Sequence, residues 1–313
     1  MWNKPWRMQE GFVIGGGLIC AGLMLELAVG KVMWDAFSWP ANLIVLAGFL
    51  LLALLFFLQP KSYFSRFLAS YHAAVPALVY VVALTIIMGL TRQQANGTWF
   101  NDMLSFWPFV LIYTYVALIL ALVVLNRLSR LLRGKKKWVW RSDVPFFLNH
   151  GGILIALVTA TLGNADMQRL KMITVVGEPE WRAVDDRGVV QELPIAIQLK
   201  KFILEEYPAE MEPQISADSV MMQRTPKRFA SDILILTKSG KKISATVDVN
   251  QPVSIEGWNI YQYGYDTQMG AMSSISILEL VSDPWLPFVY TGIWMMIAGA
   301  ITMFIFGVRR KRA

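Results

Sequence analysis

The chain contains two histidines, His72 and His150, and each lies within a long apolar run. An imidazole in the hydrocarbon of a membrane costs free energy unless it has a partner, so a histidine at such a position is a candidate functional residue. Two neutral imidazoles on different helices are the ligand set of a b-type haem with two axial histidines. We therefore predict that His72 and His150 are axial ligands of haem iron.

A plainer alternative is that each imidazole only reaches the membrane surface or bonds a neighbouring carbonyl. The aromatic residues before each histidine, such as Tyr71 and Phe146, suit a porphyrin pocket and a lipid interface equally well. Gly151-Gly152, directly after His150, allows close approach of a flat ligand, although packing against another helix is the commoner use of such a pair. The residues alone leave these alternatives open.

Other chemistries have little support in this sequence. The single cysteine, Cys20, excludes a disulfide framework, a zinc site built on cysteines and covalent attachment of c-type haem. No Walker loop, His-Glu-x-x-His motif or Ser-His-acid set is present. Glu26 lies in the first apolar run and suggests a proton relay, a partner for a positive group, or a hydrated carboxylate. We favour the hydrated carboxylate, because the run ends about one helical turn later.

The amino-acid composition indicates the kind of fold that positions the two histidines. Hydrophobic residues make up 55% of the 313-residue chain, charged residues make up 16%, and the mean hydropathy is +0.46, as is typical of a membrane protein. Six runs have the length of about 20 residues that a bilayer requires: 11–30, 41–58, 68–90, 107–126, 144–163 and 285–307. If the third span is helical from about Arg66 and the fifth from Asp143, His72 and His150 lie ~9 Å and ~10 Å into their helices, at similar depths.

Lysine and arginine orient the six spans. Alternate loops and both ends of the chain hold fifteen of these residues, seven of them within 127–141, whereas the short loops on the other side hold only Lys31 and Arg92. The excess predicts that both termini are cytoplasmic and that segment 164–282 is outside. The net charge of +7 is therefore a topology signal and does not indicate a nucleic-acid partner.

The segment 164–282 is predicted to be a mainly β, sandwich-like domain inserted before the last span. Short β-branched or aromatic runs alternate with turn residues, and Ser239-Gly240 is a predicted hairpin turn. Ile195–Tyr207 fits neither the helical nor the strand period cleanly. The predicted strands are Lys171–Val176, Asp232–Thr237, Ile243–Val249, Trp258–Asp266 and Ser274–Val281.

The strand Trp258–Asp266 has two interpretations. Alternation places Tyr261, Tyr263 and Tyr265 on one face, where they could form an aromatic platform for a flat ligand or a partner. We favour an interior strand that is packed on both faces. The fold class is thus a polytopic α-helical membrane protein with a membrane domain over 1–163, an extracytoplasmic β-rich domain over 164–282, and a last span with a basic tail over 283–313.

Three blocks of sequence resemble a known family, the ResB/CcsB subunits of the System II cytochrome c biogenesis machinery. The first runs from Asn149-His150-Gly151-Gly152 to Asn164-Ala165-Asp166, the second from Val249-Asn250-Gln251-Pro252 to Tyr263-Gly264-Tyr265-Asp266, and the third is Asp283-Pro284-Trp285-Leu286-Pro287. The resemblance covers roughly 140–313 well and 1–140 in outline.

The resemblance implies a protein of the bacterial inner membrane that helps to carry haem b across the membrane and present it for attachment to apocytochrome c. It implies a CcsA-type membrane subunit as partner, which carries the tryptophan-rich haem-handling motif absent here. The chain would then be a non-catalytic or half-catalytic subunit of a holocytochrome c synthase, or haem lyase. His72 resembles the family's ligand in an early span, and His150 lies in the first matching block.

A second function remains open. The chain could be a membrane-anchored assembly or chaperone protein whose outer β-domain binds apocytochrome or a thiol-redox partner without binding haem. A small-molecule transporter is a weaker prediction, because the sequence shows no inverted repeat and no discontinuous spans.

Overall fold

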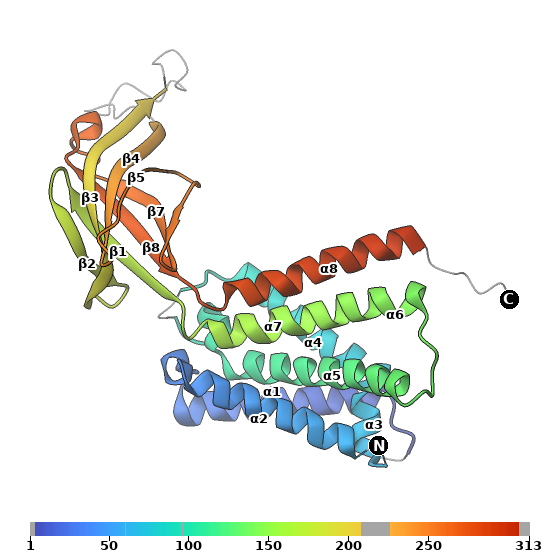
Figure 1. The fold of residues 1–313 in the computed structure, drawn as a ribbon. Coiled ribbons are helices and arrows are strands. Elements are labelled where there is room, and N and C mark those ends of the chain that lie inside the picture. The colour runs from blue at the N-terminus through green and yellow to red at the C-terminus, as the bar shows by residue number, and fades with distance from the viewer. Residues whose placement is uncertain (1–3, 60, 95–96, 208–225, 307–313) are drawn as a thin grey trace. The chain divides into compact units, whose positions relative to one another are not determined.

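The computed structural model describes residues 4–59, 61–94, 97–207 and 226–306 (Figure 1). The chain divides into two compact units. One comprises Met1–Asp166 with Trp285–Ala313, and the other comprises Met167–Pro284. The sequence-based limits of the inserted domain are 164 and 282. The basic tail, 307–313, lies outside the described residues.

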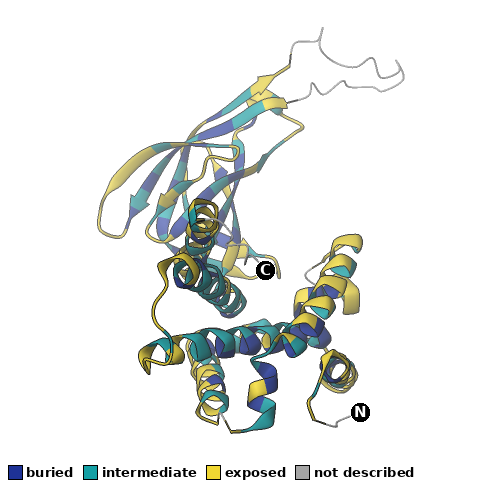
Figure 2. Ribbon diagram, turned by 90° about the vertical axis from the view of Figure 1, so that its right-hand side faces the viewer, coloured by how far each residue is buried: buried dark blue, intermediate teal, exposed yellow. Residues whose placement is uncertain are grey.

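The first unit is helical, and it confirms the predicted multi-pass membrane protein. Among the described residues, six helical segments are long and apolar enough to cross a bilayer. Much of their surface is exposed apolar side chain, as at Leu27, Ile44 and Phe304, which suits contact with lipid (Figure 2).

The helices are α1 (Met8–Val29), α2 (Ala41–Leu58), α3 (Tyr63–Leu68), α4 (Tyr71–Leu90), α5 (Trp107–Leu132), α6 (Trp140–Phe146), α7 (Gly152–Gly163) and α8 (Leu286–Phe306). A π-helical turn, η3 (Phe147–Gly151), joins α6 to α7, and two 3₁₀ segments, η1 (Trp34–Phe37) and η2 (Trp99–Ser105), lie in the loops.

The starts of two spans differ from the prediction. The third span begins at Tyr71, because Ser70 has an extended backbone and its hydroxyl donates to the Phe67 carbonyl, which separates α3 from α4. The fifth span begins at Trp140. His72 is therefore ~1.5 Å from the start of its helix and His150 ~15 Å from the start of its own, and these distances do not compare the depths of the two residues.

Close helix contacts in this unit occur at glycines. Gly11 and Gly15 of α1 meet α4, and Gly22 of the same helix meets Pro108 of α5. Gly152 of α7 and Gly292 of α8 face each other, and a Cβ on either one would lie 2.6 Å from the other's carbonyl oxygen. Small residues let helix backbones approach closely in a membrane.

The second unit is a single antiparallel sheet, and its β-rich fold was predicted. The strands are β1 (Gln168–Val175), β2 (Pro179–Asp185), β3 (Val190–Glu206), β4 (Pro226–Thr237), β5 (Lys242–Asp248), β6 (Val253–Ile255), β7 (Trp258–Tyr265) and β8 (Ile275–Ser282). Among the described residues their order is β5-β4-β3-β2-β1-β8-β7-β6. The sheet curls until β5 and β7 contact each other, which encloses a core of alternating inward residues such as Ile197, Ile235 and Leu280. The ambiguous stretch 195–207 belongs almost entirely to β3.

The predicted strand over 258–266 is present as β7, between β8 and β6. Trp258 is buried in the core, as an interior strand requires. The outer face is less covered than predicted, because Tyr263 is 51% exposed. A bulge between Gln262 and Gly264 shifts the register, so Tyr265 lies on the inner face and stacks on Phe202. The three tyrosines therefore do not share one face.

Candidate functional site

The π-helical turn η3 presents His150. A π turn contains an extra residue, so backbone carbonyls lose their usual partners, and such turns are frequent at functional sites. Two side chains of the turn reach back four residues to the preceding carbonyls: Asn149 Nδ2 donates to Pro145 O at 2.8 Å, and His150 Nδ1 lies 3.1 Å from Phe146 O. The wide turn is thus stabilised by side chains of the Asn149-His150 pair.

The contact between Nδ1 of His150 and the Phe146 carbonyl determines which ring nitrogen carries the proton. A carbonyl oxygen can only accept a hydrogen bond, so Nδ1 of His150 must carry the proton. In the neutral ring, Nε2 then has a free lone pair. Donation from one ring nitrogen to a carbonyl is the usual arrangement of a histidine that binds metal through the other nitrogen. The contact is also the one expected for the plainer alternative, an imidazole that bonds a neighbouring carbonyl, and it leaves Nε2 of His150 available to bind metal.

His150 lines an apolar cavity of about 420 Å³ between α4, α5 and α7. The wall from α4 and the two residues before it combines small side chains with two large ones: Ala69, Ser70, Ala74 and Ala77 with Tyr71 and Leu78. The remaining wall includes Val116, Ile119, Leu120, Val123 and Ile153. Among the described residues that line this cavity, His150 supplies the one side-chain nitrogen. The volume is within the range of ligand pockets.

A charged cluster holds the aromatic ring next to His150. The ring of Phe146 stacks on His150, with centroids 4.2 Å apart, and the guanidinium of Arg127 also lies 4.2 Å from the Phe146 centroid. Arg127 is held in turn by Asp143, whose fully buried carboxylate accepts its Nε and Nη2 at 2.8 Å and 2.6 Å. Lys136 and the Val139 amide also donate to Asp143. The cluster therefore fixes where α6 enters the π turn.

His72 does not reach this cavity. The residues of α4 that line it, at 70, 71, 74, 77 and 78, share one face, and His72 lies about 160° around the helix from the centre of that face. The carbonyl of His72 instead faces Gly11 of α1, and its ring stacks obliquely on Tyr71 at 3.9 Å. No contact found in the described part of the chain joins His72 to His150. His72 thus contacts Tyr71, which lines the cavity, but His72 does not line the cavity itself.

Glu26 has a role that the sequence interpretation missed. Its carboxylate is buried and accepts the backbone N–H of Trp107, the first residue of α5, at 3.2 Å. The N-terminus of a helix has unsatisfied N–H groups and a partial positive charge, which a carboxylate stabilises. The favoured interpretation, a carboxylate hydrated by water, is therefore wrong, and Glu26 joins α1 to α5.

The residues that carry the family resemblance at the ends of α7 and α8 contact one another. Asp166 accepts the indole N–H of Trp285 at 2.6 Å, the amide of Asn42 at 2.7 Å and the backbone N–H of Trp39 at 2.7 Å. Burial alone raises the pKa of Asp166, but these three hydrogen bonds outweigh it, so the pKa lies below its ordinary value. A Cβ on Gly163 would overlap the Trp285 side chain. Asp166 thus ties α2, α7 and α8 together.

Bare metal ions have no evident site. No group of three or more His, Cys, Asp or Glu in the described ranges could hold a metal ion. Haem iron needs fewer ligands from a protein than a bare ion does, because the porphyrin supplies four nitrogens and the protein supplies one or two axial ligands. The single imidazole of His150 is enough for one such ligand.

Comparison with known proteins gives two matches. Residues 142–279 match the model of the ResB-like family, which confirms the resemblance drawn from the sequence. One similar solved structure is described as "Cytochrome c Heme Lyase CcmF", with a TM-score of 0.38, 10% identity, and coverage of 96% of this chain and 46% of that chain. This chain thus spans less than half of that protein. No curated protein matches the sequence.

Proposed function

The chain is ResB-like over residues 142–279, and from this match and the geometry of His150 we propose that it holds haem within the membrane during cytochrome c biogenesis. The observation that carries the proposal is the Nδ1–H of His150 on the Phe146 carbonyl, which leaves Nε2 as a free base beside an apolar cavity. Haem is the cargo of this site, and His150 is one axial ligand of its iron.

The walls of the cavity support a flat, apolar cargo. The small residues of α4, such as Ala74 and Ala77, leave room for a planar ring, and the apolar residues of α5 exclude water. Because His150 is the one nitrogen ligand among the described lining residues, we propose that a second axial ligand comes from another molecule. A CcsA-type subunit in the membrane is the partner that we propose for this role. Haem shared between two chains can be passed from one to the other.

His72 remains a second proposed ligand, at a different position. It lies on the side of α4 that packs toward α1, so haem bound there would be separate from the cavity of His150. The charge bias of the loops supports cytoplasmic termini and an outer β unit. In that orientation the β unit lies on the side where apocytochrome c receives its haem. Binding of apocytochrome or of thiol-redox proteins by this unit is part of the proposal.

The decisive experiment compares three variants of the full chain, purified with its copurifying partners and measured by absorption spectrum and haem content. His150→Gly should lose most of the haem, and added imidazole should restore the Soret band because it replaces the missing base. Ala74→Phe should also lose haem by filling the cavity, but imidazole should not restore it. His72→Gly removes the other proposed ligand and should lose only the haem bound on the α1 side of α4.

The possible results separate the alternatives. Haem loss in His72→Gly alone would move the site to the other side of α4 and contradict the role of His150. Wild-type haem content and cytochrome c maturation in both glycine variants would contradict the haem-ligand proposal altogether. Colourless wild-type protein that still binds apocytochrome would support the assembly-protein alternative.

A further inference from the structure

A cavity of about 360 Å³ lies between α4, α5 and α7, the same three helices that enclose the cavity of His150. Its wall includes Leu104, which is 54% exposed, so the cavity reaches the surface of the helical unit. We call it the Met88 cavity. Five of its lining residues carry oxygen, nitrogen or sulfur in their side chains: Thr85, Met88, Tyr113, Thr161 and Asn164.

The two cavities follow one another along the same faces of α4 and α7. On α4 the lining positions 71, 74, 77 and 78 are followed by 85 and 88. On α7 and directly after it, Ile153 is followed by Ala160 and Asn164, at spacings that return to one face of a helix. The rise from Ile153 to Asn164 is ~16 Å. A flat molecule that leaves the cavity of His150 along this side of the unit therefore meets the Met88 cavity next.

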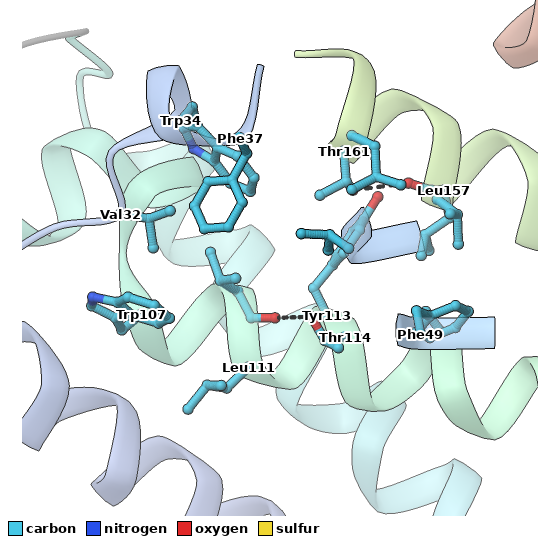
Figure 3. Close-up of a pocket in the computed structure, with 15 residues that line it drawn as sticks. Val32, Trp34, Phe37, Phe49, Trp107, Leu111, Tyr113, Thr114, Leu157 and Thr161 are labelled. Carbon is cyan, nitrogen blue, oxygen red and sulfur yellow. Dashed lines mark hydrogen bonds between the residues drawn. The ribbon is translucent and has the colours of Figure 1, made fainter. Parts of the chain in front are cut away.

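Two of the hydroxyl groups in the Met88 cavity are already paired. Tyr113 of α5 reaches Thr161 of α7, as Figure 3 shows from the side of the neighbouring cavity that these two residues also line. Thr161 donates its hydroxyl hydrogen to Leu157 O, so its bond to Tyr113 uses the hydrogen of Tyr113. Neither hydroxyl therefore has a hydrogen left for a ligand.

Thr85 and Asn164 are the remaining donors in the wall. Both residues are exposed, so a bound molecule can reach their side chains. The backbone N–H of Asn164 donates to Ala160 O, but no described residue bonds its side-chain amide or the hydroxyl of Thr85. An amide with two N–H groups and a hydroxyl can both donate to a carboxylate. The sequence block Asn164-Ala165-Asp166 thus contains a polar side chain that the tie at Asp166 does not use.

A base follows the same end of α4. The short loops on this side of the helical unit hold Lys31 and Arg92, and Lys31 is paired with Asp102 at 2.8 Å. Arg92 is exposed, forms no ion pair with any described residue, and comes four residues after Met88. The charge bias of the loops keeps bases away from this side, so Arg92 is an exception to it. A guanidinium is the side chain best suited to bind a carboxylate.

We propose that the Met88 cavity is a relay site for haem that leaves the cavity of His150, which rests on the function proposed above. Met88 Sδ is an axial ligand of the iron, and the Asn164 amide and the Arg92 guanidinium hold a haem propionate. Haem has its iron at the centre of an apolar ring and its carboxylates on one edge. A thioether in the wall with donors at one end matches that arrangement, and methionine is an established type of axial ligand.

The first test uses the full chain in detergent as the His150→Gly variant, without imidazole, so that the remaining binding reports the Met88 cavity. Ferric haem and its dimethyl ester are the probes, and absorption titration is the measurement. Haem should bind about tenfold more tightly than the ester, which lacks the carboxylates, as expected for a charged hydrogen bond. Addition of Asn164→Leu and Arg92→Gln should make the two affinities equal.

The second test removes the sulfur with little change in size. In the His150→Gly background, Met88→Leu should weaken haem binding about tenfold and abolish the near-infrared band that ferric haem shows with a methionine ligand. Binding of metal-free protoporphyrin should not change, because it has no iron for the sulfur to ligate. Met24→Leu, at a position 65% exposed on α1, is the matched control and should behave like its parent.

The outcomes separate this proposal from the role of His150. Equal affinity for haem and ester in His150→Gly, or an unchanged spectrum and affinity after Met88→Leu, would overturn the relay site and leave His150 untouched. If His150→Gly keeps the haem content of wild type, the role of His150 is contradicted. Loss of that haem in Met88→Leu then supports the Met88 cavity as a haem site, and its retention overturns it. If His150→Gly fails to fold, the second equivalent of haem or ester added to wild type gives the same comparison.

Discussion

The segment from α6 to α7 has two neighbours, and the two contacts are built differently. Toward α8 the helices meet at Gly152 and Gly292 with no space for another side chain between them. Toward α4 and α5 the same segment borders the cavity at His150, and toward α2 and α5 it borders a cavity lined by Phe49, Leu111 and Leu157. We call the contact between α7 and α8 the closed seam, and the side of α6 and α7 that faces α2, α4 and α5 the open seam. In the closed seam, van der Waals packing of backbones holds the helices together.

The open seam is held mainly by polar ties near its ends. Asp143 binds Arg127 of α5 at one end, and Asp166 binds Asn42 of α2 and Trp285, the residue before α8, at the other. Cavities lie between the two ties. Backbone packing would leave no room for the flat cargo proposed above, whereas ties at the ends of the wall leave its middle accessible. The comparison indicates that a ligand fits on the side of α7 that faces α5 and does not fit between α7 and α8.

The largest effect is expected at the tie around Asp143. Asp143→Asn leaves the positive charges of Arg127 and Lys136 without their partner, and removal of one member of a buried ion pair costs about 3 kcal/mol of unfolding free energy. Thermal unfolding in detergent measures this loss. Asp186→Asn, at a carboxylate 68% exposed, is the control and should be nearly neutral.

The Asp143→Asn variant also tests how His150 is positioned. When Arg127 is no longer held, Phe146 loses the cation above its ring and the π turn loosens. Folded Asp143→Asn protein should therefore bind haem more weakly and require more imidazole for rescue of a His150→Gly background. Stability loss with a wild-type spectrum would mean that the cluster supports the fold alone.

The next prediction compares an alanine substitution in the closed seam with one on lipid-facing surface. In Gly292→Ala the new Cβ would lie 2.6 Å from Gly152 O and 2.8 Å from Ala156 Cβ, so α7 and α8 must separate. Overpacking of this kind costs about 1–3 kcal/mol. Gly48→Ala on α2 meets nothing within 4 Å and should be neutral or stabilising by up to ~1 kcal/mol, because alanine is the better helix former. Equal stability of both variants would contradict the closed seam.

Much of the fold could be predicted because it follows from local patterns. Apolar runs identified the six spans, and alternation identified β1, β4, β5, β7 and β8. The short strands β2 and β6 gave no clear signal, since Pro179 and Glu180 begin one and the other has three residues. The long strand β3 was ambiguous because polar residues interrupt its alternation.

The site was less predictable, because it depends on contacts distant in sequence. His150 was found from its position in an apolar run. Arg127 was counted with the topology-determining bases, and nothing in its neighbourhood signals that it reaches Asp143, sixteen residues later. The break at Ser70 that moves the start of α4 comes from one hydroxyl contact. The position of His72 along its helix therefore differs from the estimate, although the span itself was correct.

The smallest effect concerns the tie at Asp166 and depends on pH. Trp285→Phe removes the indole donor of Asp166 but keeps an aromatic ring against Gly163, and it should cost about 1 kcal/mol because the carboxylate is partly exposed. Trp294→Phe on the same helix should cost less. Because hydrogen bonds lower the pKa of folded Asp166 from its ordinary 3.8, its stabilising contribution is complete above about pH 4.

That contribution disappears as the pH falls through the lowered pKa, where folded Asp166 becomes protonated. Wild type and Trp285→Phe should therefore differ in melting temperature at pH 6 and converge as the pH falls below the ordinary pKa of 3.8 and through the lowered one, while wild type and Trp294→Phe keep a constant difference. A gap between wild type and Trp285→Phe that does not change with pH would mean that the ring packing on Gly163, and not the charged hydrogen bond, holds this end of the open seam. The end near α8 would then be closed like the α7–α8 contact, and Asp143 would be the one charged tie of the two.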